Sequence, residues 1–580
     1  RPPARKTRLA QGRRRFPEQT MSASTATPNP EAAPERSRLY WFFFHLRRRT
    51  VGALWQWTRR NPLLGGITYV VLLALLYAFR ASYQPAFLFL RKYFVLALAI
   101  GVLLYLLHRV YRRAKTTGKI MVVLTTAALA AGVWFWGAPM VNYLASYYHY
   151  RSLNKVELAE LPLTGHERIQ PLNSVATMAD QEALNETQSA SSPDFIRRAD
   201  GRFDFSMAVG PSPDYPLQRL TRPVDQIISV SATSPAPDFS ADNRYAVHFD
   251  VGEQLLFGRN VRGVAIRKFS LGQYLSCQPD QVRFMEDDQG RWVQVVSLVR
   301  WKGFLFPRPV FGGVLVMDQR TPGPGAMAER IFLGRGRYYS PQALASIGWL
   351  KGQNLLPERA SRFTAQSFRF HRGFLAPFPG YHEGDVRIPQ LPDDLNGMPY
   401  VTWFNFDGVA ANAENGLYDY YGLEPFLVGK SGLNLSLFLP GDGSPEVFFM
   451  DHSRLESGLF GSSAVPVKVR ESRKEYDWSA SAAVESRPFI RDIGDKRRFF
   501  WLTTVVTRSD AGSKGFVGGS MPDITLTDAL GRQVVWVDRQ QIADTRLWEQ
   551  QIIREIGANW GLPDPSQPSA PEASQPDSTP

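Results

Sequence analysis

The chain has 580 residues, a formal net charge of +14 and one cysteine. A composition of 44% hydrophobic and 13% aromatic residues excludes a wholly disordered protein. A single cysteine excludes an intrachain disulfide framework and a cysteine-based structural zinc site.

The positive charge is concentrated at the N-terminal end. Residues 1–150 hold 22 Arg and Lys against 3 Asp and Glu, a balance of +19, whereas residues 151–580 hold 45 against 50, a balance of −5. The basic excess surrounds apolar segments, where positive charge orients membrane helices. The remainder is mildly acidic, so we expect no nucleic-acid partner.

The first 60 residues divide into two parts. Residues 1–38 are rich in Arg and Pro and poor in large apolar residues, which predicts a disordered basic N-terminus. Residues 39–60 alternate aromatic clusters with five arginines, too many for a membrane span. Aromatic rings beside guanidinium groups suit the lipid headgroup layer, so we expect an interfacial amphipathic segment here. A short soluble helix is the alternative interpretation.

Three apolar runs lie within residues 61–148: Leu63–Phe79, Tyr93–Leu107 and Ile120–Tyr143. A membrane span takes about 20 residues, and each run is bracketed by Arg or Lys and by aromatic residues. We therefore expect about three transmembrane helices in this region.

The flanking charges predict the orientation. The N-terminal segment and the loop between the second and third runs carry more Arg and Lys than the loop between the first two. The positive-inside rule then places the N-terminus in the cytoplasm. Everything after about residue 148 would be periplasmic or extracellular, in a multi-pass protein of the cell membrane.

Strand patterns dominate after residue 148. The predicted strands are Arg244–Asp250, Gln281–Glu286, Arg291–Trp301, Pro309–Asp318, Leu433–Leu439, Glu446–Met450, Phe499–Thr507, Asp523–Thr527 and Gln533–Val537. The predicted helices are fewer: Ser174–Ala190, Pro341–Lys351 and Gln540–Trp560.

Stretches rich in Pro and Gly at 321–325 and 374–398 mark breaks, and we place a domain boundary near 325–340. The sequence thus predicts a β-rich extracytoplasmic domain at 149–330, a second α+β extracytoplasmic domain at 331–561, and a disordered tail at 562–580. The fold class is a membrane α-helical anchor of about three transmembrane helices plus a large β-rich α+β extracytoplasmic region.

One stretch carries most of the metal-ligating side chains. His371, His382 and Asp385 lie in a segment rich in Pro and Gly, and two imidazoles with a carboxylate would suit a divalent metal, with Glu383 as a general base. The spacing matches no zinc signature, because His382-Glu383 lacks the second histidine of H-E-x-x-H. A polar surface loop is the alternative, and no catalytic or cofactor-binding residue is assigned.

Three other motifs are incomplete. Val428-Gly429-Lys430-Ser431 resembles the end of a phosphate-binding loop, but Glu424 stands where that loop needs Gly. In Asp451-His452-Ser453, neighbouring residues of an extended segment face opposite sides, so they form no catalytic triad by themselves. The stretch 461–464 lacks the final Gly of a nucleophile elbow. The apolar runs contain almost no ionisable residue, which argues against transport by this chain alone.

These observations favour a non-enzymatic, membrane-anchored envelope protein. Its outer region would bind or scaffold another envelope component, a protein or a polymer. One alternative is an extracytoplasmic metal-dependent hydrolase that uses His371, His382 and Asp385. The other is an accessory subunit of a membrane transport or secretion complex.

Overall fold

A computed structural model describes residues 61–113, 115–182, 184–234, 237–321, 323, 325–391, 397–427, 432–454, 458–493, 496–507, 523–537 and 556–557. The predicted disordered ends, the predicted interfacial segment 39–60 and most of the predicted helix Gln540–Trp560 lie outside these residues. The chain divides into two compact units, one that ends at Leu75 and one that starts at Leu76.

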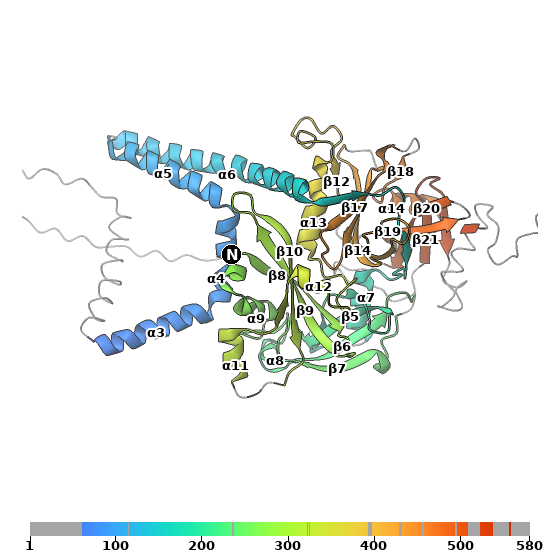
Figure 1. Cartoon of the computed structure of the whole chain (residues 1–580), viewed down its shortest axis with the longest axis horizontal. Helices are drawn as coiled ribbons and strands as arrows, with labels where there is room; N and C mark the ends of the chain where they lie inside the picture. The colour runs from blue at the N-terminus through green and yellow to red at the C-terminus, as the bar shows by residue number, and fades with distance from the viewer. Residues whose placement is uncertain are drawn as a thin grey trace, which may run out of the picture. The chain divides into compact units, whose positions relative to one another are not determined.

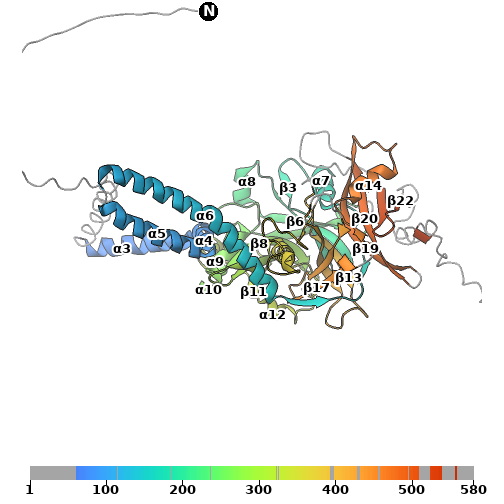
Figure 2. The same ribbon diagram turned by 90° about the horizontal axis from the view of Figure 1, so that it is seen from above.

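Four helices open the described part of the chain: α3 (Pro62–Ala78), α4 (Arg80–Lys92), α5 (Phe94–Arg113) and α6 (Thr116–Ser152). Of these, α5 and α6 are long and apolar enough to cross a membrane, and α3 with α4 gives a third if this bent pair is one span. This agrees with the prediction of about three apolar helices. The helices α5 and α6 lie side by side in both views (Figures 1 and 2).

Helix α6 is longer than a bilayer requires. Its 37 residues correspond to about 55 Å of helix, against a hydrocarbon core of about 30 Å. The C-terminal part of α6 runs beside α13 (Glu358–Ser367) of the β-rich region (Figure 1). A helix that crosses a membrane here would therefore continue into the folded region without a break.

Helix α4 occupies the segment that the sequence treats as a loop between the first two apolar runs. Its buried residues Arg80, Gln84 and Leu88 recur every four positions, which places them on one face of the helix. Two of the three are polar, so the pattern does not look like an apolar stripe. The hydrophobic pattern of the sequence therefore does not predict this helix.

The buried face of α4 is held by hydrogen bonds to backbone carbonyls. The guanidinium of Arg80 donates to the carbonyls of Arg267 and Phe332 at 2.7 and 2.8 Å. Gln84 Nε2 donates to the carbonyls of Tyr274 and Cys277, both at 2.9 Å.

Near the other end of α4, Arg91 donates to the carbonyls of Leu275 and Trp301 at 2.5 and 3.0 Å. Together with Arg80 and Gln84, it connects the helix to α9 (Val261–Lys268), α10 (Leu271–Tyr274) and the strands that follow.

The largest sheet in the described residues has seven strands in the order β1-β17-β16-β14-β13-β2, with β12 paired to β14. The strands are β1 (Asn154–Glu157), β2 (Leu163–Gly165), β12 (Val386–Arg387), β13 (Tyr400–Asn405), β14 (Gly416–Pro425), β16 (Leu435–Pro440) and β17 (Glu446–Asp451). β1 is parallel to β17, and the other pairs are antiparallel. Because β1 and β2 precede the predicted boundary near 325–340, strands from both sides of that boundary share this sheet.

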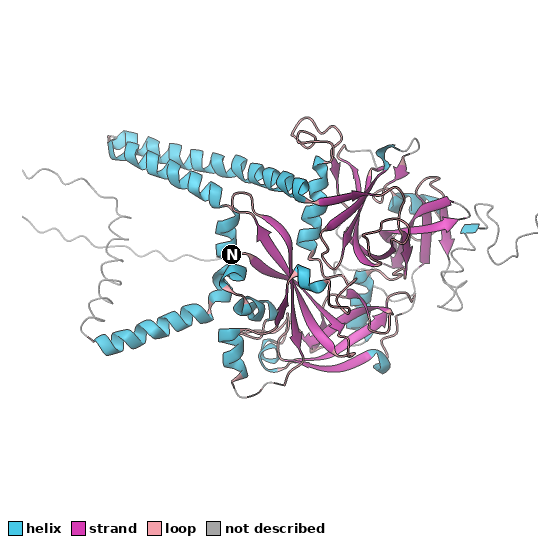
Figure 3. Cartoon of the chain, in the orientation of Figure 1, coloured by secondary structure: helices cyan, strands magenta, loops and turns pink. Residues whose placement is uncertain are grey.

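Antiparallel sheets make up the rest of the described β structure (Figure 3). One contains β8 (Cys277–Glu286), β9 (Trp292–Lys302), β10 (Arg308–Asp318) and β11 (Arg337–Tyr339). A second contains β3 (Gln188–Ala190), β4 (Asp194–Arg197), β5 (Phe203–Pro211), β6 (Val224–Ser231) and β7 (Arg244–Phe249). A third contains β19 (Ser481–Ile493), β20 (Lys496–Thr507), β21 (Asp523–Asp528) and β22 (Val534–Val537). The short strands β15 (Gly432–Leu433) and β18 (Leu459–Phe460) form a pair.

The strand predictions agree with the structure more closely than the helix predictions. The predicted strands Gln281–Glu286 and Arg291–Trp301 correspond to β8 and β9, which pair as a hairpin, and Asp523–Thr527 and Gln533–Val537 correspond to β21 and β22, which pair as another. The predicted helix Ser174–Ala190 is wrong at its end, because α7 (Leu172–Glu182) stops and Gln188–Ala190 pairs as β3. The predicted helix Pro341–Lys351 is also too long, since α12 (Pro341–Leu344) is a single turn before a series of turns that includes Gly348.

We predict that Gln84→Met destabilises the full-length protein by about 1–3 kcal/mol, because two buried carbonyls lose their donor. Ser82→Ala, on the exposed side of the same helix, is the control and should change stability by less than about 0.5 kcal/mol. Chemical unfolding of both variants in detergent micelles measures the difference. Equal stabilities would show that the α4 hydrogen bonds contribute nothing.

Candidate binding site

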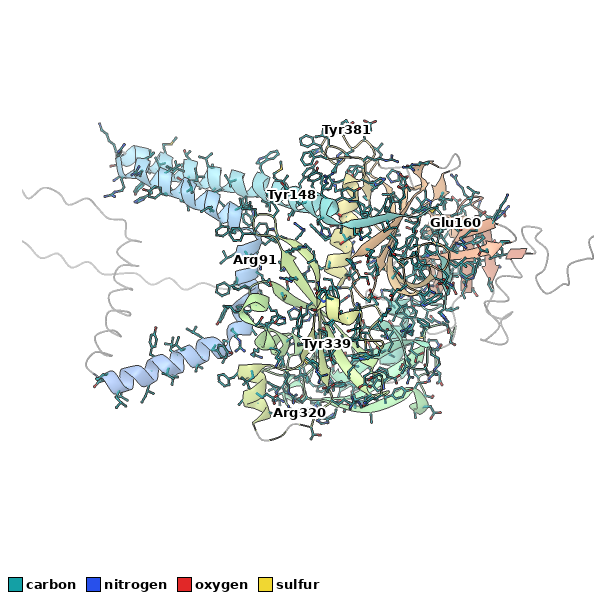
Figure 4. All side chains as sticks on the ribbon, in the orientation of Figure 1. Arg91, Tyr148, Glu160, Arg320, Tyr339 and Tyr381 are labelled. Atoms are coloured by element: carbon teal, nitrogen blue, oxygen red, sulfur yellow. The ribbon has the colours of Figure 1, made fainter. Side chains whose placement is uncertain are left out.

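A cavity of about 1030 Å³ lies between the helices α4 and α6 on one side and α13 with β12 on the other. We call it the α4–α13 cavity. Its volume is at the upper end of the range for small-molecule sites, roughly 300–1,000 Å³. Figure 4 labels Arg91 on α4, Tyr148 on α6 and Tyr381 in the loop after α13.

Three helices contribute to the cavity wall with the same spacing. In each, the lining residues stand at positions i, i+3, i+4 and i+7, which is one face of an α-helix. They are Pro85, Leu88, Phe89 and Lys92 on α4, Pro139, Asn142, Tyr143 and Ser146 on α6, and Arg359, Arg362, Phe363 and Gln366 on α13.

The charged side chains that line the cavity are mostly cationic. They are Lys92, Arg359, Arg362, Arg369 and Arg387, against the one carboxylate Asp385. Five positive groups and one negative group leave a formal balance of +4. The wall also contains aromatic rings, among them Phe370 and Phe426.

Asp385 is the predicted site residue that lines this cavity. Its carboxylate is buried, and Oδ2 accepts from Arg369 at 3.4 Å and contacts Nδ1 of His382 at 3.0 Å. The ring of His382 stacks on Phe426 with centroids 3.9 Å apart. Asp385 Oδ1 is buried and has no hydrogen-bond partner among the described residues.

His371 lies in a different set of contacts. Its Nε2 is 3.4 Å from Asp451 Oδ2, and its Nδ1 is 3.4 Å from the hydroxyl of Tyr150. The structure thus brings His382 and Asp385 together and places His371 beside Asp451. Within the described residues, no group of three or more His, Cys, Asp or Glu side chains is arranged to hold a metal ion.

The other sequence motifs contribute to the core. His452 is buried and its Nε2 is 2.8 Å from Ser436 Oγ, whereas Asp451 accepts from Ser453. Burial lowers the pKa of His452 to about 4, so the ring is neutral at physiological pH. Glu424 accepts two hydrogen bonds from Ser463, and the stretch 428–431 lies outside the described residues.

A second cavity, of about 620 Å³, lies between strands of three sheets. Asp194 of β4, Arg283 of β8 and Asp419 of β14 meet there, and Arg283 Nε is 3.6 Å from Asp194 Oδ1. Burial raises the pKa of Asp194 to about 7 and that of Asp419 to about 6, although the cation Arg283 opposes both shifts.

The chain is thus a β-rich protein with two or three apolar helices and a large cationic cavity beside them. Comparison with protein-family models, with curated proteins and with solved structures gave no match.

Among the residues selected from sequence, Asp385 alone lines the α4–α13 cavity. The signal that could have found it is the repeated i, i+3, i+4, i+7 spacing in residues 85–92, 139–146 and 359–366. Each set mixes polar with apolar side chains, so it is not visible as a hydrophobic stripe.

The raised carboxyl pKa values of the second cavity predict a pH effect on stability. The folded state keeps protons on Asp194 and Asp419 that the unfolded chain releases above about pH 4, so this contribution is full below pH 4. It is lost as the pH rises through about 6 to 7.

Between pH 5 and pH 8, the free energy of unfolding of the Asp194→Asn variant should therefore fall by about 2 kcal/mol less than that of the wild type. Chemical unfolding at the two pH values tests this, with the exposed Asp214→Asn as the control. A loss as large as that of the wild type would contradict the raised pKa of Asp194.

Proposed function

We propose that this chain is a membrane-anchored protein of the cell envelope. Its β-rich region lies outside the cytoplasm and binds an envelope component in the α4–α13 cavity without converting it. The observation that carries the proposal is a large cavity whose walls come both from the apolar-helix segment and from the folded region. A ligand held there would contact both parts of the protein at once.

The lining favours binding over catalysis. Cationic, aromatic and aliphatic side chains surround the space, which is typical of recognition surfaces. A catalytic site brings a nucleophile or a metal together with a base. In the described residues, Ser436 contacts His452 and Thr364 contacts His149 in this way, but none of these four residues lines the cavity.

A metal-dependent hydrolase is the second candidate, and one contact favours it. A carboxylate on Nδ1 of a histidine, as between Asp385 and His382, is the arrangement that orients a histidine toward a metal through Nε2. Metal analysis of the purified protein tests it: a stoichiometric metal that is lost in His382→Ala would support the hydrolase.

An accessory subunit would instead purify in a defined heteromeric assembly after gentle detergent extraction.

The binding proposal is tested by photo-crosslinking in growing cells. A benzoylphenylalanine at Gln366, an exposed position in the cavity wall, should capture a product. The same group at Thr221, exposed at the end of α8 (Pro216–Thr221), is the control. No product at position 366, or the same products at both positions, would contradict binding in the cavity.

The proposed orientation predicts which positions react with a membrane-impermeant maleimide in intact cells. Ser444→Cys, exposed in the β-rich region, should be labelled, whereas Lys115→Cys, between α5 and α6, should react only after the cells are opened. The native Cys277 is buried, so the wild type provides the unlabelled control. Labelling of position 115 in intact cells with protection of position 444 would reverse the orientation.

A further inference from the structure

We infer that the α4–α13 cavity binds an acidic phospholipid of the membrane, with its phosphate-bearing headgroup toward α13 and β12 and its chains toward α4. The inference rests on the proposed function and names the class of component that is bound. Three independent features of the cavity support it: its charge, its apolar wall and its level along α6.

The charge of the cavity matches an anion. The guanidinium of Arg369 is 3.4 Å from the carboxylate of Asp385, which also contacts His382, and Arg359 is 3.9 Å from the carboxylate of Asp280. Arg362 is 3.4 Å from Glu358, and both of these side chains are largely exposed. These separations are long for charge-assisted hydrogen bonds, which are typically about 2.7–2.9 Å. The guanidinium groups therefore retain donors for a phosphate.

Among the described residues, Lys92 and Arg387 line the cavity without a carboxylate within ion-pair distance. Arg387 pairs in register with Glu424 of β14. Its guanidinium carbon lies 5.7 Å from the centre of the Phe426 ring, on the same wall as Asp385. A guanidinium presents a planar fork of donors that fits phosphate oxygens. Arg387 and Arg362 thus form the expected headgroup contacts.

The apolar wall argues for a lipid and against a free phosphate. On the α4 side the cavity is lined by Pro85, Leu88 and Phe89, and Phe363 and Phe370 lie on the α13 side. A soluble phosphate would leave this apolar surface wet, whereas acyl chains would cover it at a gain of about 25 cal/mol for each Å². The volume of about 1030 Å³ is also far larger than a phosphate needs.

The level of the cavity along α6 corresponds to a bilayer surface. Phe135 and Trp136 are exposed on α6 after an apolar stretch that starts at Ile120, and aromatic residues of this kind mark the membrane–water interface. The lining residues Pro139 to Ser146 follow Trp136 by 3 to 10 positions, which is about 4–15 Å along the helix. The cavity therefore begins at the headgroup layer, where a lipid can enter.

Asp385 guides the choice of probe. Its Oδ1 is a buried acceptor without a partner in the described part of the chain, so a hydroxyl on the ligand would satisfy it. Phosphatidylglycerol combines an anionic phosphate with headgroup hydroxyls. Phosphatidylcholine with the same chains has no net charge and no hydroxyl, so it is the matched neutral lipid.

The experiment measures lipid binding to the full-length protein in a neutral detergent, by native mass spectrometry and by the lipid-induced rise in unfolding temperature. We expect phosphatidylglycerol to bind and phosphatidylcholine not to. Arg362→Gln/Arg387→Gln should weaken phosphatidylglycerol roughly tenfold to thirtyfold, for two cations that each interact with an anionic lipid. Arg202→Gln/Arg454→Gln removes two exposed arginines that each pair with one carboxylate elsewhere, and should bind like the wild type.

A second variant guards against a folding defect. Gln366→Glu adds a negative charge at an exposed cavity position of α13 and should also weaken phosphatidylglycerol. Equal binding of the two lipids, or unchanged binding in both cavity variants, would overturn the inference. Equally tight binding of glycerol phosphate would show a soluble anion as the ligand and would also overturn it.

The two proposals fail separately. If position 366 captures a protein or polymer and the chain shows no preference for phosphatidylglycerol, the proposed binding function is supported and the lipid inference is wrong. If no crosslink forms at position 366, the proposed binding function itself is contradicted.

Discussion

The hydrogen bonds between α4 and the folded region are the constraint on which the rest of the arrangement depends. Arg80, Gln84 and Arg91 direct side-chain donors to backbone carbonyls of segments that lie 184 to 252 residues later. Backbone carbonyls cannot move without the secondary structure that contains them. The short helix between two apolar runs is thereby fixed against the sheet of β8 to β11, and one wall of the α4–α13 cavity is fixed with it.

Contacts of α6 with α13 and the segment after it join the two sides of the cavity by similar means. His149 Nε2 near the end of α6 is 2.9 Å from Thr364 Oγ1 on α13, and the Tyr143 hydroxyl donates to the carbonyl of Phe374 at 2.5 Å. The last apolar helix, α6, also ends at Ser152, and β1 of the largest sheet begins at Asn154, so no linker separates them. Helix α6 is thus joined to α13 by side-chain contacts and to that sheet through β1.

The sequence predicts the elements whose period is simple and misses those that depend on distant partners. The hairpins β8–β9 and β21–β22 alternate around turn residues, and α5 and α6 are long apolar runs, so local pattern suffices. Helix α4 buries the polar residues Arg80 and Gln84. Their burial depends on the carbonyls of Phe332 and Cys277, which accept their hydrogen bonds and are distant in the sequence. The segment 183–190 has helical composition, but Gln188–Ala190 is taken up by an edge of the sheet beside β5. Tertiary pairing overrides local propensity there.

The candidate site illustrates the same limit. Asp385 and His382 could be selected from sequence because they are close in the chain, and they do meet, but His371 is separated from them by its contact with Asp451. The cations that define the cavity come from α4, α13, the turn Phe368–Phe370 and β12, and no single stretch contains more than a few of them. The overall charge balance pointed away from the β-rich region, which is mildly acidic as a whole. Four of its arginines nevertheless lie together with Lys92 of α4 at one place beside the apolar helices, where the local balance is +4.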